Sequence, residues 1–167
     1  MTLRNVARRW RDRLTLMLNA GPTVRQSGAI PYAFVDGRAV FLIITSRRTG
    51  RWIFPKGGAI EGKPPWEVAA HEAFEEAGVE GEIETAPIGA YRDVKIDGTR
   101  RTPIEVELYP LRVVREIEDW PEKHSRNRRW TNLSDAERLL AIPRAAELAA
   151  QLARRLAQQT VASHRES

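Results

Sequence analysis

Three glutamates between residues 67 and 77 have the type and spacing that could bind a metal ion: Glu72, Glu75 and Glu76. In a helix, separations of three and four residues place them on one face. The like charges of Glu72 and Glu76 would cost about 0.2–0.5 kcal/mol on an exposed helix. A hard divalent cation, Mg²⁺ or Mn²⁺, would offset this cost because carboxylate oxygens are its preferred ligands. A solvated charged face balanced by nearby arginines is the alternative.

The segment just before these glutamates favours the metal site. Pro55, Lys56, Gly57 and Gly58 follow one another, and two adjacent glycines let the backbone approach other groups closely. Carbonyl oxygens of this loop could then join the carboxylates around one ion. An isolated Gly-Gly pair would indicate only a turn. A glycine loop placed shortly before an acidic helix is much less common.

The composition limits the classes of function. The chain has 167 residues, which indicates one domain, and 42% of them are hydrophobic, as in a globular protein. The absence of cysteine excludes disulfides, cysteine-bound zinc, iron–sulfur clusters and thiol catalysis. No apolar run is long enough to span a membrane, and no signal peptide is visible, so we expect a cytoplasmic protein. The net charge of +5 suits a polyanionic partner, either a nucleic acid or a small phosphorylated molecule.

The remaining elements are expected to form a frame around this acidic helix. Asp36-Gly37 and Asp97-Gly98 separate apolar runs and predict tight hairpin turns. Ser134 and Glu137 predict a capping box at the start of a further helix. The order of elements predicts an α+β fold, a mixed sheet layered with helices. Strands are expected over residues 28–35, 39–45, 52–54, 88–96, 104–114 and 128–132, and helices over residues 67–77 and 145–159.

The ends of the chain differ from its centre. Residues 2–19 alternate apolar and arginine residues at helical spacing and predict a basic amphipathic helix. It is expected to pack on the domain or on a second subunit, which would give a homodimer; binding to a membrane surface is the alternative. We therefore expect a basic extension over residues 1–24, the main domain over residues 25–142, and a C-terminal helix and tail over residues 143–167.

The segment from Gly57 to Val79 resembles the Nudix box, G-x5-E-x7-R-E-U-x-E-E-x-G-U, where U is a bulky aliphatic residue. Three positions depart from the pattern: Lys63 replaces a Glu, His71 replaces the Arg, and Ala73 replaces a bulky aliphatic residue. The Glu and Arg commonly pair in this family, so their joint replacement suggests a changed anchoring of the loop. The matching residues are Gly57, Glu72, Glu75, Glu76, Gly78 and Val79.

The resemblance implies a fold and a reaction. Nudix hydrolases have an α/β/α sandwich with a mixed sheet and a loop-helix that carries the box. They cleave a diphosphate linked to another moiety, with water and usually Mg²⁺. By position, Glu72 and Glu76 would bind the metal with a backbone carbonyl near Gly57, and Glu75 would be the base that activates water. Glu105 and Glu107 could add a distal carboxylate, but alternation with apolar residues favours outward-facing side chains.

The flanking segments are most similar to the diphosphoinositol polyphosphate phosphohydrolase-like branch. The similarity rests on residues 45–47, 51–55, 75–79, 119–120 and 126–130. It implies a small phosphate-rich substrate, either a diphosphoinositol polyphosphate or a diadenosine polyphosphate, bound by cationic side chains. The residues expected to contact its phosphates are Arg25, Ser27, Arg47, Lys56, Arg101 and Arg126.

Two other functions stay open. One is a pyrophosphohydrolase acting on nucleotides, nucleotide sugars or 5′-triphosphorylated RNA. The other is a non-catalytic module that binds nucleic acid on the same scaffold. The second is disfavoured because a pure binder has no need for Glu72, Glu75 and Glu76, and because no RNA-binding motif with interleaved aromatics is present.

Overall fold

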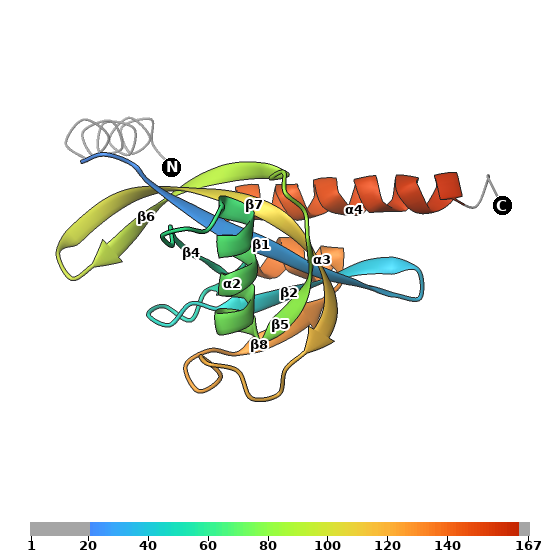
Figure 1. Cartoon of the computed structure of the whole chain (residues 1–167), viewed down its shortest axis with the longest axis horizontal. Helices are drawn as coiled ribbons and strands as arrows, with labels where there is room; N and C mark the ends of the chain where they lie inside the picture. The colour runs from blue at the N-terminus through green and yellow to red at the C-terminus, as the bar shows by residue number, and fades with distance from the viewer. Residues whose placement is uncertain (1–20, 164–167) are drawn as a thin grey trace, which may run out of the picture.

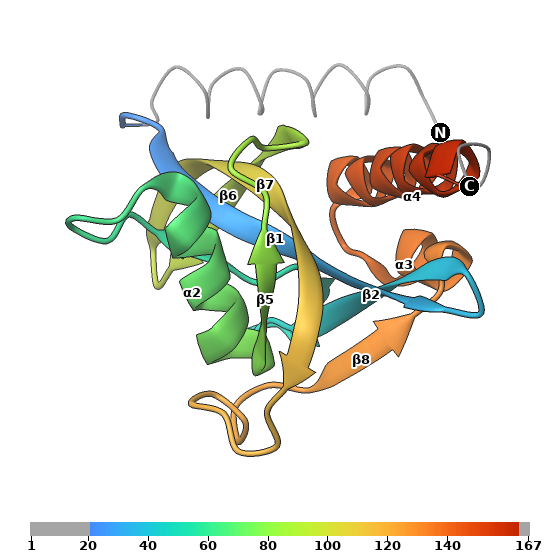
Figure 2. The same cartoon turned by 45° about the vertical axis from the view of Figure 1, so that its right-hand side comes forward.

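The computed structural model describes residues 21–163, in which a mixed sheet is covered by helices on both faces (Figures 1 and 2). Eight strands are hydrogen-bonded into this sheet, with the central order β3-β2-β1-β7-β5. The strands are β1 (Val24–Val35), β2 (Arg38–Thr45), β3 (Trp52–Ile53), β4 (Lys56–Gly58), β5 (Val79–Ile83), β6 (Gly89–Asp97), β7 (Arg100–Glu116) and β8 (Arg128–Thr131). The helices are α2 (Pro65–Ala77), α3 (Leu133–Leu139) and α4 (Pro143–Ser163).

The centre of the sheet is a parallel pair between β1 and β7, whereas the other strand pairs are antiparallel. Ser27 lies opposite Glu107 of β7 and opposite Gly57 of β4. The glycine loop is therefore joined directly to the central strand. This mixed sheet with helices confirms the predicted α+β class.

Small residues allow α2 to lie close to one face of the sheet. Ala69, Ala73 and Ala77 are fully buried there, against Ala29 of β1 and Leu42 of β2. On the opposite face, α3 and α4 cover a second apolar cluster, and Figure 2 shows these helices on the far side of the sheet from α2. Leu148, Leu152 and Leu156 of α4 are buried in that cluster, so α4 is part of the core. The predicted helix over residues 2–19 lies outside the described residues.

The predicted turns are confirmed by their backbone angles. Asp36 and Gly37 have φ of 49° and 73°, as a tight hairpin turn requires. Gly78 has φ of 65°, and its N–H donates to the carbonyl oxygens of Ala73 and Phe74, which ends α2 as expected. No helix among residues 21–163 is both long and apolar enough to cross a membrane.

Three local predictions were wrong. Residues 56–58 form β4 although a loop was expected, because β1 supplies hydrogen-bonding partners for this short segment. Strand β5 was missed because its sequence, VEGEI, is short and has a central glycine. The capping box at Ser134 does not form: Asn132 is the N-cap of α3, and its side chain accepts a hydrogen bond from Asp135 N at 2.8 Å.

Candidate active site

Helix α2 presents its glutamates to the β4 strand because of how it begins and ends. Pro64 and Pro65 start the helix with a fixed φ, which suits its first turn. Its apolar face packs on the sheet, so the adjacent face, with Glu72 and Glu76, meets the loop that leads into β4. The predicted helical face is therefore present, with Glu72 and Glu76 against β4 and Glu75 beside His71.

The carboxylate of Glu72 lies against the backbone of Gly57. A Cβ atom at Gly57 would overlap both carboxylate oxygens, with Oε2 only 2.7 Å away. Burial raises the pKa of Glu72, and the nearby charge of Glu75 acts in the same direction. Only a glycine leaves space for Glu72 at this point, which explains physically why this position of the box must be small.

Glu76 is buried and held at both carboxylate oxygens. Its Oε2 accepts a hydrogen bond from the backbone N–H of Lys56 at 3.1 Å, and its Oε1 is paired with Arg126. Its side chain is only 9% exposed. Burial raises the pKa of Glu76 to about 7, although Arg126 and the Lys56 N–H act in the opposite direction. A cation near Glu76 would stabilise its charged form.

Glu75 contacts His71, one turn earlier in α2. The His71 Nε2 atom lies 3.3 Å from Glu75 Oε1. The side chain of Glu75 is 41% exposed, so water can reach it. Glu75 is therefore accessible, whereas Glu76 is enclosed.

The donor set of this site fits a hard cation. Glu72 and Glu76 supply carboxylate oxygens beside the backbone of Lys56 and Gly57, and the sequence has no cysteine. The space over Gly57 that a Cβ would fill is taken by a carboxylate, which brings oxygen ligands close to the main chain. Within residues 21–163, no three acidic or histidine side chains are already gathered tightly enough to hold a metal.

Among the predicted phosphate contacts, Ser27 and Lys56 lie beside the glutamates. Ser27 is buried next to Gly57 in the sheet, and Arg25, two residues earlier on the same strand, is exposed. Lys56 directs its backbone N–H at Glu76, while strand alternation sends its side chain to the other face. There its Nζ donates to Gln26 Oε1 at 3.2 Å, and burial lowers the pKa of Lys56.

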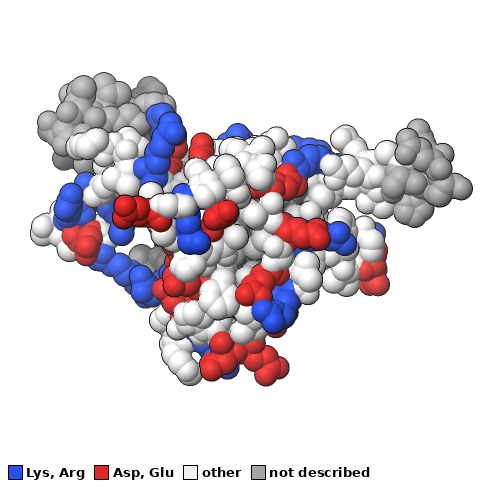
Figure 3. Space-filling view, in the orientation of Figure 1, with Lys and Arg blue, Asp and Glu red and all other residues white. Residues whose placement is uncertain are grey.

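Arg47 and Arg101 lie on two exposed segments that are connected to each other. Arg48, next to Arg47 in the β2–β3 loop, donates to the carbonyl oxygen of Ile96 and lies 3.4 Å from Asp97. Ile96 is the cross-strand partner of Arg101 in the β6–β7 hairpin. Figure 3 shows lysine and arginine side chains gathered over this hairpin and the β2–β3 loop. These two segments give one end of the molecule its positive charge.

Arg126 differs from the other arginines that were predicted to contact phosphate, because it is buried. Its side chain is 5% exposed, and it contacts Glu76, Glu122 and the carbonyl oxygen of Thr45. Neither Glu122 nor Arg48 was predicted from the sequence to belong to the site. Arg48 could have been noticed as part of the basic 47–51 stretch, but no local signal identifies Glu122 because its partners are brought together by the fold.

Glu107 was expected to face outward, and the structure places it on the side of the sheet that carries α2. It is half-buried and accepts a hydrogen bond from the Tyr109 hydroxyl at 3.0 Å. Tyr109, two residues along the same strand, packs with the alanines of α2. A distal carboxylate therefore lies on the face of the sheet that holds the other glutamates.

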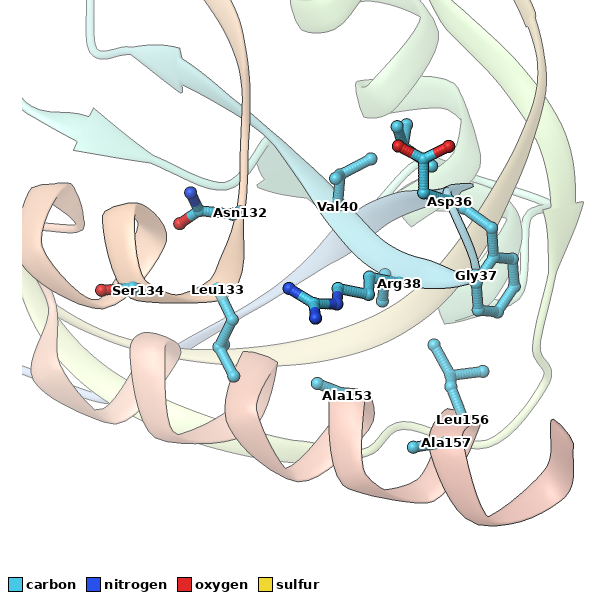
Figure 4. A pocket seen from close by; sticks show the side chains of 13 residues that line it. Asp36, Gly37, Arg38, Val40, Asn132, Leu133, Ser134, Ala153, Leu156 and Ala157 are labelled. Atoms are coloured by element: carbon cyan, nitrogen blue, oxygen red, sulfur yellow. The ribbon is translucent and has the colours of Figure 1, made fainter. Parts of the chain in front are cut away.

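A large cavity lies elsewhere in the described part of the chain. It measures about 820 Å³ and is formed by the β1–β2 hairpin, α3 and α4 (Figure 4). Its lining is mostly apolar and includes Val40, Leu133 and Leu156, with Asp36 and Arg38 at the hairpin turn. It lacks the paired carboxylates and glycine backbone that diphosphate chemistry needs, so the candidate active site is the one on α2.

Comparison with known proteins agrees with this geometry. The model of the NUDIX domain family matches residues 25–155. The chain belongs to the Nudix family. The match extends into α4, as expected from the burial of that helix in the core.

Several curated relatives within the Nudix family are similar to this chain. The chain is 32% identical over 128 residues to Nudix hydrolase 12, mitochondrial, of Arabidopsis thaliana, covering 72% of this chain and 59% of that protein. It is 36% identical over 103 residues to diphosphoinositol polyphosphate phosphohydrolase 3-beta of Bos taurus, covering 60% of this chain and 59% of the relative. Each match thus spans about three fifths of the relative's length.

A solved structure confirms the Nudix fold. A C. elegans Ap4A hydrolase in a binary complex superposes with a TM-score of 0.62 over 81% of this chain and 99% of that one, at 21% identity. At this identity, the likeness concerns the fold. Together with the family match, it supports the Nudix fold for this chain.

Proposed function

We propose that this protein is a Mg²⁺-dependent diphosphohydrolase of small, phosphate-rich substrates, and that Mn²⁺ can replace Mg²⁺. The observation that carries the proposal is the placement of Glu72 and Glu76 against the Lys56–Gly57 backbone. It brings two carboxylates and the main chain together at the point where the Nudix box predicts a metal. Within the family, this arrangement belongs to the catalytic loop-helix rather than to a structural site.

The residues divide into three roles. Glu72, Glu76 and the Gly57 carbonyl oxygen would hold the metal. Glu75, which is exposed and lies beside His71, would accept the proton of the attacking water. When bound, the metal supplies positive charge that neutralises the phosphate oxygens as negative charge builds up.

Cationic side chains around the glutamates would orient the substrate. Arg47 and Arg101, which lie on two segments joined by Arg48, would bind the outer phosphates. Arg25, which is exposed on β1 opposite Glu105, would add a further contact. Ser27, which lies opposite Gly57, would contact the phosphates there, whereas the Lys56 side chain would have to leave Gln26 on the other face of the sheet to reach them. Arginine binds phosphate oxygens through two parallel hydrogen bonds, so several arginines favour a ligand with several phosphates.

The substrate class is either a diphosphoinositol polyphosphate or a diadenosine polyphosphate. The name of the Bos taurus relative supports the first, and the name of the C. elegans structural neighbour supports the second. The basic segments over the β2–β3 loop and the β6–β7 hairpin suit both. A cytoplasmic location and a homodimer stay predictions.

A substrate panel tests the proposal. The purified full chain is incubated with Mg²⁺ and, in separate reactions, diphosphoinositol pentakisphosphate, diadenosine tetraphosphate, ADP-ribose, a nucleotide sugar and 5′-triphosphorylated RNA. Released phosphate and nucleotides are measured, with a Glu72→Gln variant as the control. We expect the highest kcat/KM on one of the first two substrates. A preference for one of the other three would establish the pyrophosphohydrolase alternative, and binding of RNA without cleavage of any substrate would establish a non-catalytic module.

A further inference from the structure

The segment from Asp119 to Trp130 marks the branch resemblance, but the proposed chemistry does not explain why Arg126 in it is buried. We infer that Arg126 is a positioning residue: it fixes the carboxylate of Glu76, and Glu122 fixes Arg126 in turn. This inference rests on the proposed function, because it concerns how a metal-binding carboxylate is held. It replaces the expectation that Arg126 binds a phosphate of the substrate.

Every nitrogen of the Arg126 guanidinium already has a protein acceptor. Nη2 pairs with Glu76 Oε1, Nε pairs with Glu122 Oε2, and Nη1 donates to the Thr45 carbonyl oxygen at 3.0 Å. Because the side chain is only 5% exposed, little of it faces solvent, where a phosphate would approach. A phosphate contact would require the guanidinium to give up at least one of these partners.

The same contacts restrict Glu76 to one orientation. Arg126 donates to Oε1 of Glu76, and the Lys56 N–H donates to Oε2. A carboxylate with a donor on each oxygen has its side-chain torsions fixed, and charge-assisted hydrogen bonds are the stronger kind. Each carboxylate oxygen has a second lone pair, which leaves coordination capacity for a cation. Arg126 therefore holds Glu76 in place without using all of its acceptor capacity.

The segment that carries Arg126 is attached to the ends of both β2 and α2. The Thr45 N–H donates to the Asn127 carbonyl oxygen at 3.0 Å, and the Asn127 N–H donates to Thr45 Oγ1 at 2.8 Å. The Glu122 N–H donates to the Glu75 carbonyl oxygen at 3.1 Å. These backbone attachments make Arg126 a rigid connection between the two elements.

Glu122 extends the arrangement toward the substrate. Its Oε1 atom lies 3.6 Å from Nη1 of Arg47, while its Oε2 contacts Arg126. The four side chains therefore form a row of alternating charge, in the order Glu76, Arg126, Glu122 and Arg47. The row connects a proposed metal ligand with a proposed phosphate contact.

Metal binding to the full chain tests this role without relying on catalysis. Mn²⁺ is titrated into metal-free protein and followed by electron paramagnetic resonance, for wild type, Arg126→Ala, Arg126→Lys, Glu76→Gln and the Arg126→Ala/Glu76→Gln double variant. Arg129→Ala is the control, because Arg129 is an exposed arginine three residues away. The kcat and KM of wild type, Arg126→Ala and Arg126→Lys are measured on the substrate that the panel selects.

We expect Arg126→Ala to raise the Kd for Mn²⁺ at least tenfold and to lower kcat more than it raises KM. Arg126→Lys keeps the charge and a donor, so its Kd for Mn²⁺ should stay within about threefold of the wild-type value. The Kd of Arg129→Ala should equal that of wild type. In the Glu76→Gln background, Arg126→Ala should add less than a twofold change, because contacting residues that act as a unit are non-additive.

Two results would overturn the inference. One is unchanged or tighter Mn²⁺ binding in Arg126→Ala together with a raised substrate KM, which would make Arg126 a phosphate contact. The other is independent, multiplicative losses in the double variant. If Arg126→Ala does not fold, as judged by circular dichroism, Arg126→Gln takes its place in the same comparisons.

Failure of the proposed function would be seen separately. A wild-type protein that neither binds Mn²⁺ nor cleaves any diphosphate refutes the proposed function. The Arg126–Glu76 pair is then tested by a double-mutant cycle on thermal unfolding, with wild type, Arg126→Ala, Glu76→Gln and the double variant. Absence of coupling would show that Arg126 does not hold Glu76 in place.

Discussion

The carboxylate of Glu72 occupies the space that a side chain at Gly57 would need. Strand β4 and helix α2 can therefore approach each other only because residue 57 is a glycine. The adjacent Gly58 has no such restriction: a Cβ atom there would meet nothing within 4 Å. Two neighbouring glycines in one short strand thus have different physical roles.

Gly57→Ala is accordingly expected to abolish diphosphate hydrolysis by displacing Glu72, with a loss of at least 100-fold in kcat/KM. Gly58→Ala is the matched control and should keep activity within a few-fold of wild type. Steady-state kinetics and Mn²⁺ titration of both variants check this. Equal activity of the two variants would show that Glu72 does not need its place over Gly57.

Glu75→Gln and Glu72→Gln should separate proton transfer from metal binding. Glu75 faces His71 and solvent rather than Gly57, so Glu75→Gln should lower kcat by two or more orders of magnitude and leave the Mn²⁺ affinity nearly unchanged. Glu72→Gln should weaken Mn²⁺ binding as well as turnover. A large loss of Mn²⁺ affinity in Glu75→Gln would instead make Glu75 a metal ligand.

Metal affinity should depend on pH through Glu76. Its pKa is raised by burial to about 7, so at lower pH a proton competes with the cation for its carboxylate. Below pH 7, the apparent Mn²⁺ affinity should fall about tenfold for each pH unit, as expected for one competing proton. Titrations between pH 5.5 and 8.5 measure this, and Glu76→Gln should flatten the dependence.

The sign is opposite for the stability of the metal-free protein. Because the pKa of Glu76 is higher in the folded state than the ordinary value of 4.5, the folded state binds this proton more strongly. The contribution of Glu76 to the free energy of unfolding therefore decreases as the pH rises from about 4.5 to about 7. Urea unfolding of wild type and Glu76→Gln across this range should show the difference.

Arg128 is expected to determine the stability of the end of α2. Its Nη1 donates to the carbonyl oxygens of Ala77, Gly78 and Ile117, and its guanidinium lies 4.0 Å from the centre of the Trp120 ring. Arg128→Ala removes these hydrogen bonds and a cation–π contact, at a cost of about 2–4 kcal/mol. Differential scanning calorimetry should show a Tm lower by roughly 5–15 °C. Arg129→Ala, on the same strand and exposed, should shift Tm by less than about 2 °C.

The altered positions of the Nudix box should show at most weak coupling. Lys63 and His71 border one cavity of about 450 Å³, next to Glu67 and Glu80, while His71 lies near Glu75. Lys63→Glu alone should change the free energy of unfolding little. In the double variant Lys63→Glu/His71→Arg, the coupling free energy between the two residues should be about 0.2–1 kcal/mol, as for an exposed ion pair. A double-mutant cycle on thermal unfolding measures this. Zero coupling would mean that the two positions no longer meet.

Local sequence patterns were sufficient to predict α2, although not the strands β4 and β5 on either side of it. The prolines at its start, Gly78 at its end and the glutamate spacing are all short-range signals, and the structure follows them. The contact between Glu76 and Arg126 could not be read in the same way, because these residues are 50 positions apart. Whether Arg126 faces a phosphate or a carboxylate depends on where the segment before β8 folds back. The local sequence pattern does not predict the position of that segment.

The parallel pairing of β1 and β7 has a consequence for how the chain folds. Ser27 and Glu107 are adjacent in the sheet but lie roughly 80 residues apart in the chain, so closing this pair is entropically slow. During synthesis, β1 leaves the ribosome long before its central neighbour exists. Helix α2 can form early from its own sequence, yet β1, the strand that anchors Gly57, gains its parallel neighbour only after β7 emerges. Recovery of activity after dilution from denaturant should therefore lag behind recovery of the helical signal.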